Sequence, residues 1–351
     1  MNRLGARAFF LAGSLSVFLL PVTSHASTAQ AGKTLQIYFV DVEGGQATLF
    51  VTPAGQSLLI DTGWPGHDGR DADRILAAAG KAGIRKIDFV LLTHYHQDHA
   101  GGITQLATKI PIGAVIDHGE NREHTEDTEQ VWRDYQRVLA KGNVKRIIAK
   151  PGDSLPLREI QAKVVSSDGA VVKKPLPGTG ASNTACKSPG PYPADKTENL
   201  RSLGTMITFG KVRILDLGDL TSDKEMELMC PANRLGHVDI YIVSHHGWIQ
   251  SGSPALVHGI APRVAIMDNG ETKGGSASAW DIIKKSPGLE DLWQLHFSKE
   301  GGTEHNVADS FIANLAGPDA GNYLKVTAWK DGSFEVFNSR TKTGKHYAAA
   351  H

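Results

Sequence analysis

The sequence predicts an α/β domain in which two sheets are each faced by helices. Short runs rich in β-branched residues alternate with helical stretches in the first half of the chain, and the second half repeats this alternation. We find no internal repeat with a period of roughly 20 to 50 residues. After removal of an N-terminal targeting segment about 320 residues remain, which is enough for one large core.

Residues 1–31 are predicted to be a signal peptide. Arg3 and Arg7 form a basic start, and the apolar stretch 8–20 is too short to span a bilayer comfortably. Small residues place the cleavage after Ala26 or Ala31. A retained membrane anchor is the alternative, and the absence of a basic flank after the apolar stretch disfavours it. We therefore expect residues 32–351 to form a periplasmic or secreted domain without a stable membrane anchor.

The pattern of apolar residues predicts the elements in order. In the first half, strands are expected over 35–42, 47–52 and 57–61, a helix over 71–82, a strand over 87–92, a strand over 111–117, an amphipathic helix over 127–140, and strands over 144–148 and 159–166. In the second half, strands are expected over 202–209, 212–217 and 238–244, helices over 222–230, 277–285 and 307–315, and terminal strands over 323–329 and 333–338. Asn306 is predicted to cap the helix 307–315.

Residues 173–198 interrupt this order with proline, glycine and serine in place of periodic apolar residues. The segment is therefore predicted to be a long loop. Loops of this length in a domain are commonly functional. Because this one leads directly into Asn199, we expect a lid over the site, with an inert insertion as the alternative.

Charge and cysteine content limit the partners and the compartment. Lys plus Arg equals Asp plus Glu at 37 each, and removal of Arg3 and Arg7 leaves 35 basic against 37 acidic side chains. Net charge thus does not support nucleic acid as a partner, and the basic residues within 141–150 are interpreted as a solvated face. Cys186 and Cys230 are expected to form a disulfide in an oxidising compartment, with two unpaired thiols as the alternative. The sequence does not indicate an oligomeric state.

A cluster of possible metal ligands directly follows the predicted strand 87–92. It contains His94, His96, Asp98 and His99. Imidazole and carboxylate suit zinc at catalytic sites, and the lack of cysteine in the cluster disfavours a closed structural zinc site. His94 and His96 project to one side beyond the strand, whereas Asp98 and His99 lie in the turn into the next helix. The cluster therefore predicts one ligand pair for each of two metals; a histidine-rich surface loop is the alternative.

The motif H-x-H-x-D-H resembles the signature of the metallo-β-lactamase superfamily, and the other motifs of that family follow in the expected order. These are Asp61-Thr62-Gly63, Gly218-Asp219 and Ser244-His245-His246-Gly247. The resemblance implies an αβ/βα four-layer sandwich of two mixed sheets flanked by helices. It also implies that Asp61 orients the ligand loop and that Asp219 bridges the two metals.

The same stretches resemble one branch, the hydrolase domain of ComEC-like DNA-uptake proteins. The resemblance covers residues 37–47, 61–63, 199–203, 218–219 and 244–247. As in that branch, Asn199 stands where most superfamily hydrolases carry a third histidine for the first metal. An amide oxygen is a weaker zinc ligand than imidazole, so the alternatives are a loosely held metal, His118 as a substitute ligand, or exchange with manganese. The branch also carries Gly-His-Pro after its last core strand, where this chain reads Gly274-Gly275-Ser276.

The resemblance implies two divalent ions, zinc with manganese as an alternative. The first would be held by His94, His96, Asn199 or a substitute, and Asp219; the second by Asp98, His99, Asp219 and one of His245 and His246. The remaining histidine of the pair would contact substrate or protonate a leaving group. Catalytic roles are expected for Asp98, His246 and Asp61. Asp216 is interpreted as a support for the site and not as a ligand.

The predicted activity is hydrolysis of a phosphoester or phosphodiester by a hydroxide that the metals generate. The oxygen-rich bridging ligand and the ComEC-like motifs favour it. The alternatives are a lactone or β-lactam hydrolase and a non-catalytic metal-binding module, the latter suggested by Asn199 and the missing Gly-His-Pro. The substrate would be a small-molecule or polymeric ester. His67, Arg70 and His305 are interpreted as solvated or structural, with a substrate contact as the alternative.

Overall fold

The strands of the protein form two mixed sheets. The structure, a computed structural model, describes Met1 and residues 33–141, 144–187 and 195–350. Within these ranges one sheet has nine strands and the other has eight. The predicted signal peptide and its cleavage sites lie outside the described residues. Among the helices of the described ranges, none has the length and apolar character needed to cross a membrane.

The nine-stranded sheet joins the first part of the chain to its last part. Its order is β17-β16-β15-β1-β2-β3-β4-β5-β6. The strands are β1 (Leu35–Phe39), β2 (Thr48–Val51), β3 (Ser57–Ile60), β4 (Ile87–Leu91), β5 (Ile112–Asp117), β6 (Lys145–Ile148), β15 (Leu324–Ala328), β16 (Phe334–Asn338) and β17 (Thr343–Tyr347). Strands β3 to β6 run parallel, while the pairs from β17 to β3 are antiparallel. The parallel part therefore lies at one end of the sheet.

The eight-stranded sheet has the order β14-β13-β12-β11-β10-β9-β7-β8. Its strands are β7 (Gln161–Ser167), β8 (Ala170–Val171), β9 (Gly204–Phe209), β10 (Val212–Asp216), β11 (Ile240–Ile242), β12 (Val264–Met267), β13 (Asp291–His296) and β14 (Ile312–Asn314). Strands β10 to β14 are parallel, so the carboxyl ends of β10, β11 and β12 meet at one edge.

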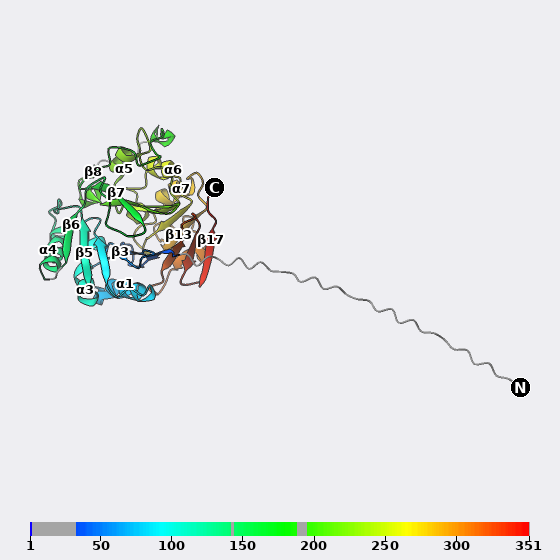
Figure 1. Cartoon of the computed structure of the whole chain (residues 1–351), viewed down its shortest axis with the longest axis horizontal. Helices are drawn as coiled ribbons and strands as arrows, with labels where there is room; N and C mark the ends of the chain where they lie inside the picture. The colour runs from blue at the N-terminus through cyan, green and yellow to red at the C-terminus, as the bar shows by residue number, and fades with distance from the viewer. Residues whose placement is uncertain (2–32, 142–143, 188–194, 351) are drawn as a thin grey trace. The chain divides into compact units, whose positions relative to one another are not determined.

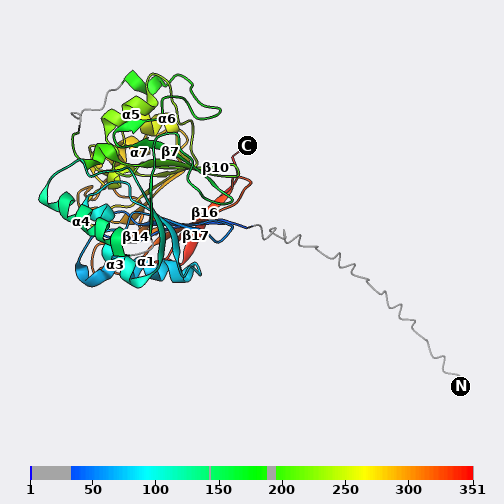
Figure 2. The ribbon, with the colours of Figure 1, turned by 60° about the vertical axis from the view of Figure 1, so that its left-hand side comes forward.

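Helices cover the outer face of each sheet, as Figures 1 and 2 show. They are α1 (Arg70–Lys81), α2 (Gln97–Ala100), α3 (Ile103–Lys109), α4 (Glu126–Lys141), α5 (Ser222–Met229), α6 (Pro254–Ile260) and α7 (Ala277–Lys284). Figure 2 shows α1, α3 and α4 on one side and α5, α6 and α7 on the other. Three apolar clusters fill the spaces: one between the sheets and one under each helical layer. This is a four-layer αβ/βα sandwich, and the predicted fold class is confirmed.

Helix α4 illustrates why the sequence forms these layers. Thr128, Val131, Tyr135 and Val138 recur at helical spacing and are buried, while the charged residues between them face outward. The Tyr135 hydroxyl donates to Asp117 Oδ2 at 2.5 Å, which satisfies a polar group inside the apolar layer. The amphipathic pattern predicted a helix over 127–140, and each end lies within one residue of the observed Glu126–Lys141.

The predicted helix 307–315 is wrong. The chain forms a short 3-10 turn at Asp309–Phe311 and then β14, whose Ile312 pairs with Gln294 of β13. Asn306 does not cap a helix, because its side-chain oxygen accepts from Ser298 N and Gln294 Nε2. Pairing with the edge strand β13 thus determines the structure of this segment, although its local sequence pattern favours a helix. Helix α6 and strands β12, β13 and β17 were not predicted.

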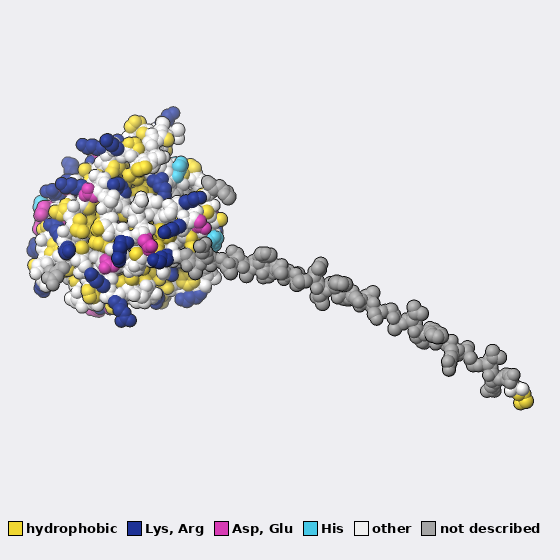
Figure 3. Space-filling model, viewed as in Figure 1, with side chains coloured by type: hydrophobic (Ala, Val, Ile, Leu, Met, Phe, Trp, Pro, Cys, Tyr) yellow, Lys and Arg dark blue, Asp and Glu magenta, His cyan; other side chains and the backbone are white. Residues whose placement is uncertain are grey.

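Basic side chains are not distributed evenly over the surface. The face drawn in Figure 3 shows many Lys and Arg side chains and few Asp and Glu. The charged side chains on this face are therefore mainly basic, although the whole chain has no net charge. The side chains are scattered among uncharged surface and do not form a continuous stripe in this view.

Candidate metal centre

The predicted ligands lie where the carboxyl ends of strands from both sheets meet. Asp61 follows β3 and the cluster from His94 to His99 follows β4, both in the nine-stranded sheet. Asp219 follows β10 and His245-His246 follows β11, in the other sheet. The carboxyl edge of parallel strands is the usual position of a site in open α/β sheets.

Four of the predicted ligands form a tight buried group: Asp98, His99, Asp219 and His246. Ligand atoms of all four lie within 4.8 Å of one another. His99 Nε2 is 3.3 Å from Asp98 Oδ2 and 3.2 Å from Asp219 Oδ1. His246 Nε2 is 3.2 Å from Asp98 Oδ2 and 3.1 Å from His99 Nε2. This is the set expected for the second metal, with His246 as the member of the histidine pair that joins it.

The two oxygens of Asp219 face different imidazoles. Oδ1 lies 3.2 Å from His99 Nε2 and 3.5 Å from His246 Nε2. Oδ2 lies 3.2 Å from His245 Nε2 and 3.9 Å from His94 Nε2. Oδ1 is buried and has no hydrogen-bond partner among the described residues. A buried carboxylate oxygen in this state is costly unless a cation completes its surroundings.

The residues expected for the first metal are only partly assembled. His94 Nε2 is 3.1 Å from His96 Nδ1, so these two imidazoles can reach one ion. Asn199 is buried in the 3-10 turn Glu198–Arg201, and its side-chain oxygen finds no hydrogen-bond partner within the described ranges.

A second group of possible metal ligands lies apart from these residues. Within the described ranges, the only other group of three or more acidic, histidine or cysteine ligands is Asp41, Glu43 and His296.

That additional group is already compensated by charge. Arg74 Nη1 donates to Asp41 Oδ2 at 3.0 Å, and His296 Nε2 lies 2.6 Å from Asp41 Oδ1. The carboxylate of Asp41 therefore has its partners within the protein.

A carboxylate stands behind three of the imidazoles. Asp61 Oδ2 is 2.7 Å from His99 Nδ1, as the predicted orienting role requires. Glu123 Oε2 is 3.0 Å from His96 Nε2. Asp268 Oδ1 is 3.4 Å from His246 Nδ1, but neither of these two atoms has a hydrogen-bond partner among the described residues. A carboxylate on the far nitrogen fixes the tautomer and orientation of a histidine ligand. Sequence reasoning missed Glu123 and Asp268; Asp268 directly follows β12, a strand that was not predicted.

The His245-His246 turn has an unusual backbone. Both histidines have positive φ, 54° and 55°, and Gly247 follows at 78°. Such non-glycine conformations persist only where the surroundings impose them. His245 N donates to Gly218 O, while the carbonyl of His246 accepts from Gly275 N. These bonds place the His246 imidazole among the ligands expected for the second metal and the His245 imidazole next to Asp219 Oδ2.

The charged state of the cluster favours a bound cation. Burial opposes a charge on His246, but Asp219 and Asp268 outweigh it and raise its pKa to about 9. Burial likewise opposes a charge on His99, and Asp219, Asp98 and Asp61 raise its pKa well above the usual value. Positive charge is therefore favoured between these carboxylates. Two facing Nε2 atoms and an unpartnered oxygen form a donor set that fits a divalent ion better than two protons.

The imidazoles next to the four-residue group behave differently. Burial lowers the pKa of His94 well below its usual value and that of His245 to about 4, with Asp219 opposing both shifts. Both side chains are therefore uncharged at neutral pH, the state in which imidazole binds a metal.

Asp216 is not part of the ligand group. Its Oδ2 accepts from Gln46 Nε2 at 2.7 Å and its Oδ1 accepts from Gly218 N at 2.9 Å. Burial is the main reason that its pKa rises to about 7. The residue thus ties the segment 37–47 to the loop that carries Asp219.

The other histidines that the sequence left open are in structural contacts. His118 Nε2 is 2.8 Å from Glu198 Oε2, and its ring packs on Tyr95 at 4.7 Å between centroids. His305 Nδ1 is 3.0 Å from Gly301 O. His67 is exposed in a 3-10 turn, and Arg70 pairs with Asp71. None of these contacts includes a ligand of the four-residue group.

Lys273 enters the site although no sequence motif indicated it. Its ammonium pairs with Asp98 Oδ2 and lies 4.8 Å from the centre of the Trp64 ring.

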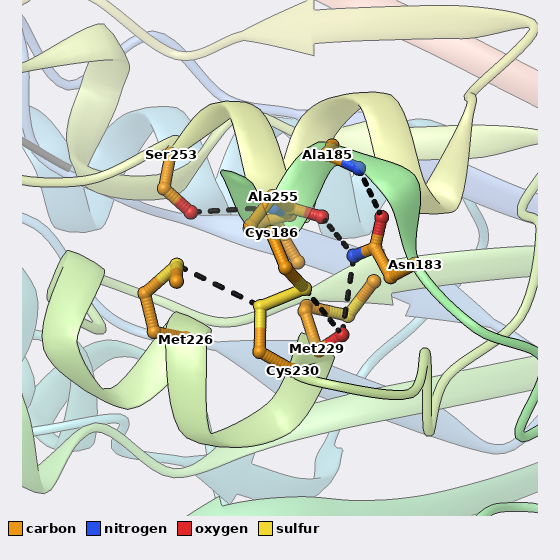
Figure 4. Close-up of a disulfide and its surroundings, with 9 residues drawn as sticks. Asn183, Ala185, Cys186, Met226, Met229, Cys230, Ser253 and Ala255 are labelled. Atoms are coloured by element: carbon orange, nitrogen blue, oxygen red, sulfur yellow. Dashed lines mark hydrogen bonds between the residues drawn. A yellow bond between two sulfur atoms is a disulfide. The ribbon is translucent and has the colours of Figure 1, made fainter. Parts of the chain in front are cut away.

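A disulfide fastens the proline-rich loop. Cys186 is bonded to Cys230, directly after α5, as expected (Figure 4). Asn183 Nδ2 donates to the carbonyls of Met229 and Ala255, which lie close to the disulfide. The stretch 173–187 is thus held on α5 and α6. Residues 188–194 of the predicted lid lie outside the described residues.

Comparison with known proteins finds a family match over part of the chain and several similar solved structures. The family model described as the metallo-beta-lactamase superfamily matches residues 40–191, which include the cluster after β4. Among solved structures, the metallo-beta-lactamase fold protein YhfI from Bacillus subtilis is 13% identical, and the match covers 75% of this chain and 96% of that chain with a TM-score of 0.46. A diphosphatase of the PhnP family is 14% identical, with 84% and 97% covered and a TM-score of 0.40.

A third structure is MEM-A1, a subclass B3 metallo-beta-lactamase isolated from a soil metagenome library. It is 14% identical, with 62% of this chain and 80% of that chain covered and a TM-score of 0.38. Roles of individual residues do not follow from identities this low. The family match over residues 40–191 contains the cluster after β4, and the four-layer sandwich with motif residues gathered at its strand ends is the arrangement that the resemblance to this superfamily implies.

Proposed function

We propose that the protein is an exported, zinc-dependent hydrolase of phosphoesters. The observation that carries this proposal is the position of Asp219, whose two oxygens face two sets of imidazoles. One carboxylate placed in this way can be shared by two ions. When bound, two divalent ions would lower the pKa of a water molecule and neutralise charge on a phosphoryl oxygen.

The residues of the chain itself define the rest of the chemistry. Asp61 and Glu123 hold the far nitrogens of His99 and His96, so these two ligands are oriented before a substrate arrives. Burial lowers the pKa of His245 to about 4, so its imidazole is uncharged at neutral pH. It can therefore accept a hydrogen bond from water or substrate. The earlier expectation of a general acid fits this residue poorly, because a general acid must carry a proton at the working pH.

The donor set supports a phosphoester over the alternatives. All ligands of the four-residue group offer oxygen or nitrogen, and both cysteines are bonded to each other. Hard oxygen donors beside imidazole suit ions that bind phosphate oxygens. The ammonium of Lys273 at the same site adds positive charge, which an anionic substrate would match. The placement in the ComEC-like branch belongs to this proposal and rests on the motifs at 37–47 and 199–203.

Export is supported by the disulfide. Disulfides persist in oxidising compartments and are rare in the cytosol. A basic, then apolar, N-terminal segment in the sequence agrees with this location.

The experiment compares substrates on protein loaded with zinc and on protein treated with chelator. Bis(p-nitrophenyl) phosphate should be hydrolysed only by the loaded form, and faster than nitrocefin or a lactone. Manganese replaces zinc in a parallel series. Faster hydrolysis of the lactam or lactone would favour the alternative hydrolase, while bound zinc without turnover of any of the three would indicate a metal-binding module.

A further inference from the structure

The loop that carries Lys273 is held in register with the metal ligands. It joins β12 to α7. Gly270 N donates to Lys273 O at 2.8 Å, and Gly275 N donates to His246 O at 2.8 Å. A Cβ atom on Gly44 would lie only 2.8 Å from Lys273 Cβ, so the glycine lets the lysine backbone approach the loop after β1. The base of this side chain is therefore fixed next to the site.

The far end of the side chain has room to move. The lysine side chain is 32% exposed, whereas Asp98, with which it pairs, is 8% exposed. The ammonium lies between the buried ligand group and the Trp64 ring, 4.8 Å from the ring centre. An aromatic face supports a cation without a fixed hydrogen bond, and the four-carbon stem of lysine is flexible.

Asp98 serves two partners through one oxygen. Its Oδ2 pairs with the Lys273 ammonium and also lies 3.2 Å from His246 Nε2 and 3.3 Å from His99 Nε2. A divalent ion among these ligands would engage the same oxygen and repel the ammonium, because like charges at this separation interact unfavourably in a buried site. Lys273 then needs another anion, and it lies at the solvent-facing side of the site.

The neighbouring glycine leaves Lys273 as the residue of this turn that reaches the ligand group. A Cβ atom on Gly275 would lie 2.7 Å from Ser298 Cβ, and Gly275 has φ of 68°, so a larger side chain does not fit there. The loop thus presents a permanent cation to the site through Lys273.

We propose that Lys273 binds a negatively charged oxygen of the substrate and makes the site select anionic phosphoesters over uncharged esters. This inference rests on the proposed function and specifies its substrate class. Lys273 moves no proton in the reaction; it holds the charged group of the substrate beside the ligand group. Its loss should therefore weaken binding more than it slows the chemical step.

The test uses two variants of the zinc-loaded full chain and one control. Lys273→Met keeps the length of the side chain and removes the charge, while Lys273→Arg keeps the charge. Lys299→Met is the control, because Lys299 is 58% exposed on the neighbouring loop and pairs with Glu271. The measurements are KM and kcat for bis(p-nitrophenyl) phosphate, hydrolysis of p-nitrophenyl acetate, zinc content, and the affinity for inorganic phosphate by calorimetry.

In Lys273→Met we expect KM for the phosphodiester and Kd for phosphate to rise about tenfold or more, since a charge-assisted hydrogen bond is lost. At equal zinc loading, acetate hydrolysis should fall far less than phosphodiester hydrolysis, Lys273→Arg should recover most of the affinity, and Lys299→Met should match the wild type. Unchanged phosphate affinity in Lys273→Met would overturn the inference, as would a rise in zinc content alone. If the wild type hydrolyses no phosphoester but the variant still loses phosphate affinity, the proposed function fails and the anion-binding role stands.

Discussion

Replacing Asp216 with asparagine should make the protein more stable at neutral pH. The carboxyl is buried at the end of β10, and burial raises its pKa from 3.8 to about 7. Because the pKa in the folded state exceeds that in the unfolded state, the folded state binds the proton more tightly. Stability from this group is therefore complete below about pH 4 and is lost as the pH rises to about 7.

The magnitude follows from the difference in pKa. A difference of about three between the folded and unfolded states corresponds to on the order of 4 kcal/mol, as an upper bound. The side chain introduced by Asp216→Asn would remain neutral at every pH. Its amide oxygen can accept from Gly218 N, and the Gln46 amide can turn to present its oxygen to the new NH₂ group.

The assay is urea unfolding of chelator-treated protein at several pH values between about 4.5 and 8. The variant and the wild type should have similar free energies of unfolding at the acidic end, and the variant should gain progressively toward pH 8. Glu227→Gln is the control, because Glu227 is an exposed residue of α5 and should show no such trend. A difference between Asp216→Asn and wild type that is independent of pH would refute the assigned protonation.

Three further predictions concern the metal and the disulfide. Asp219→Ala should lower zinc content and activity together, whereas Asp216→Asn should keep its zinc by elemental analysis; equal loss in both would mean that the wrong carboxylate was chosen. Asn199→His should tighten the first metal in a chelator competition, because imidazole is a better zinc donor than an amide, and unchanged affinity would remove Asn199 from the ligand set. The double replacement Cys186→Ser and Cys230→Ser should lower the free energy of unfolding by about 4 kcal/mol in the chain-entropy model, given a separation of 44 residues. A loss below about 1 kcal/mol in urea unfolding would show that noncovalent contacts hold the loop.

Local patterns predicted the elements and the ligands that one short stretch of sequence contains. The strand, the turn and the ligands of the cluster from His94 to His99 are contiguous in the sequence. Metal binding by this cluster could therefore be predicted without knowledge of the tertiary packing. The four-residue group needed the family motifs as well, because Asp219 and His246 come from the other sheet. Which histidine of the pair joins the group is set by a turn with two left-handed residues, which no periodicity indicates.

Residues that support the site through tertiary contacts were beyond such reasoning. Glu123 reaches His96 from the loop before α4, and Lys273 reaches Asp98 from a position 175 residues away. Neither belongs to a local pattern of ligands. The false helix at 307–315 has the same origin, since only the neighbouring strand β13 shows that the segment completes a sheet.

The site draws its ligands from both sheets, so metal and architecture are coupled. His99 follows β4 of one sheet and His246 follows β11 of the other, and their Nε2 atoms are 3.1 Å apart. An ion bound by both residues would therefore link the two sheets. Each tenfold excess of zinc over its dissociation constant would add about 1.4 kcal/mol to folding stability, and that gain would oppose separation of the two sheets. A protein built in this way would withstand proteases best with its metal site occupied, so the supply of the metal would govern its lifetime.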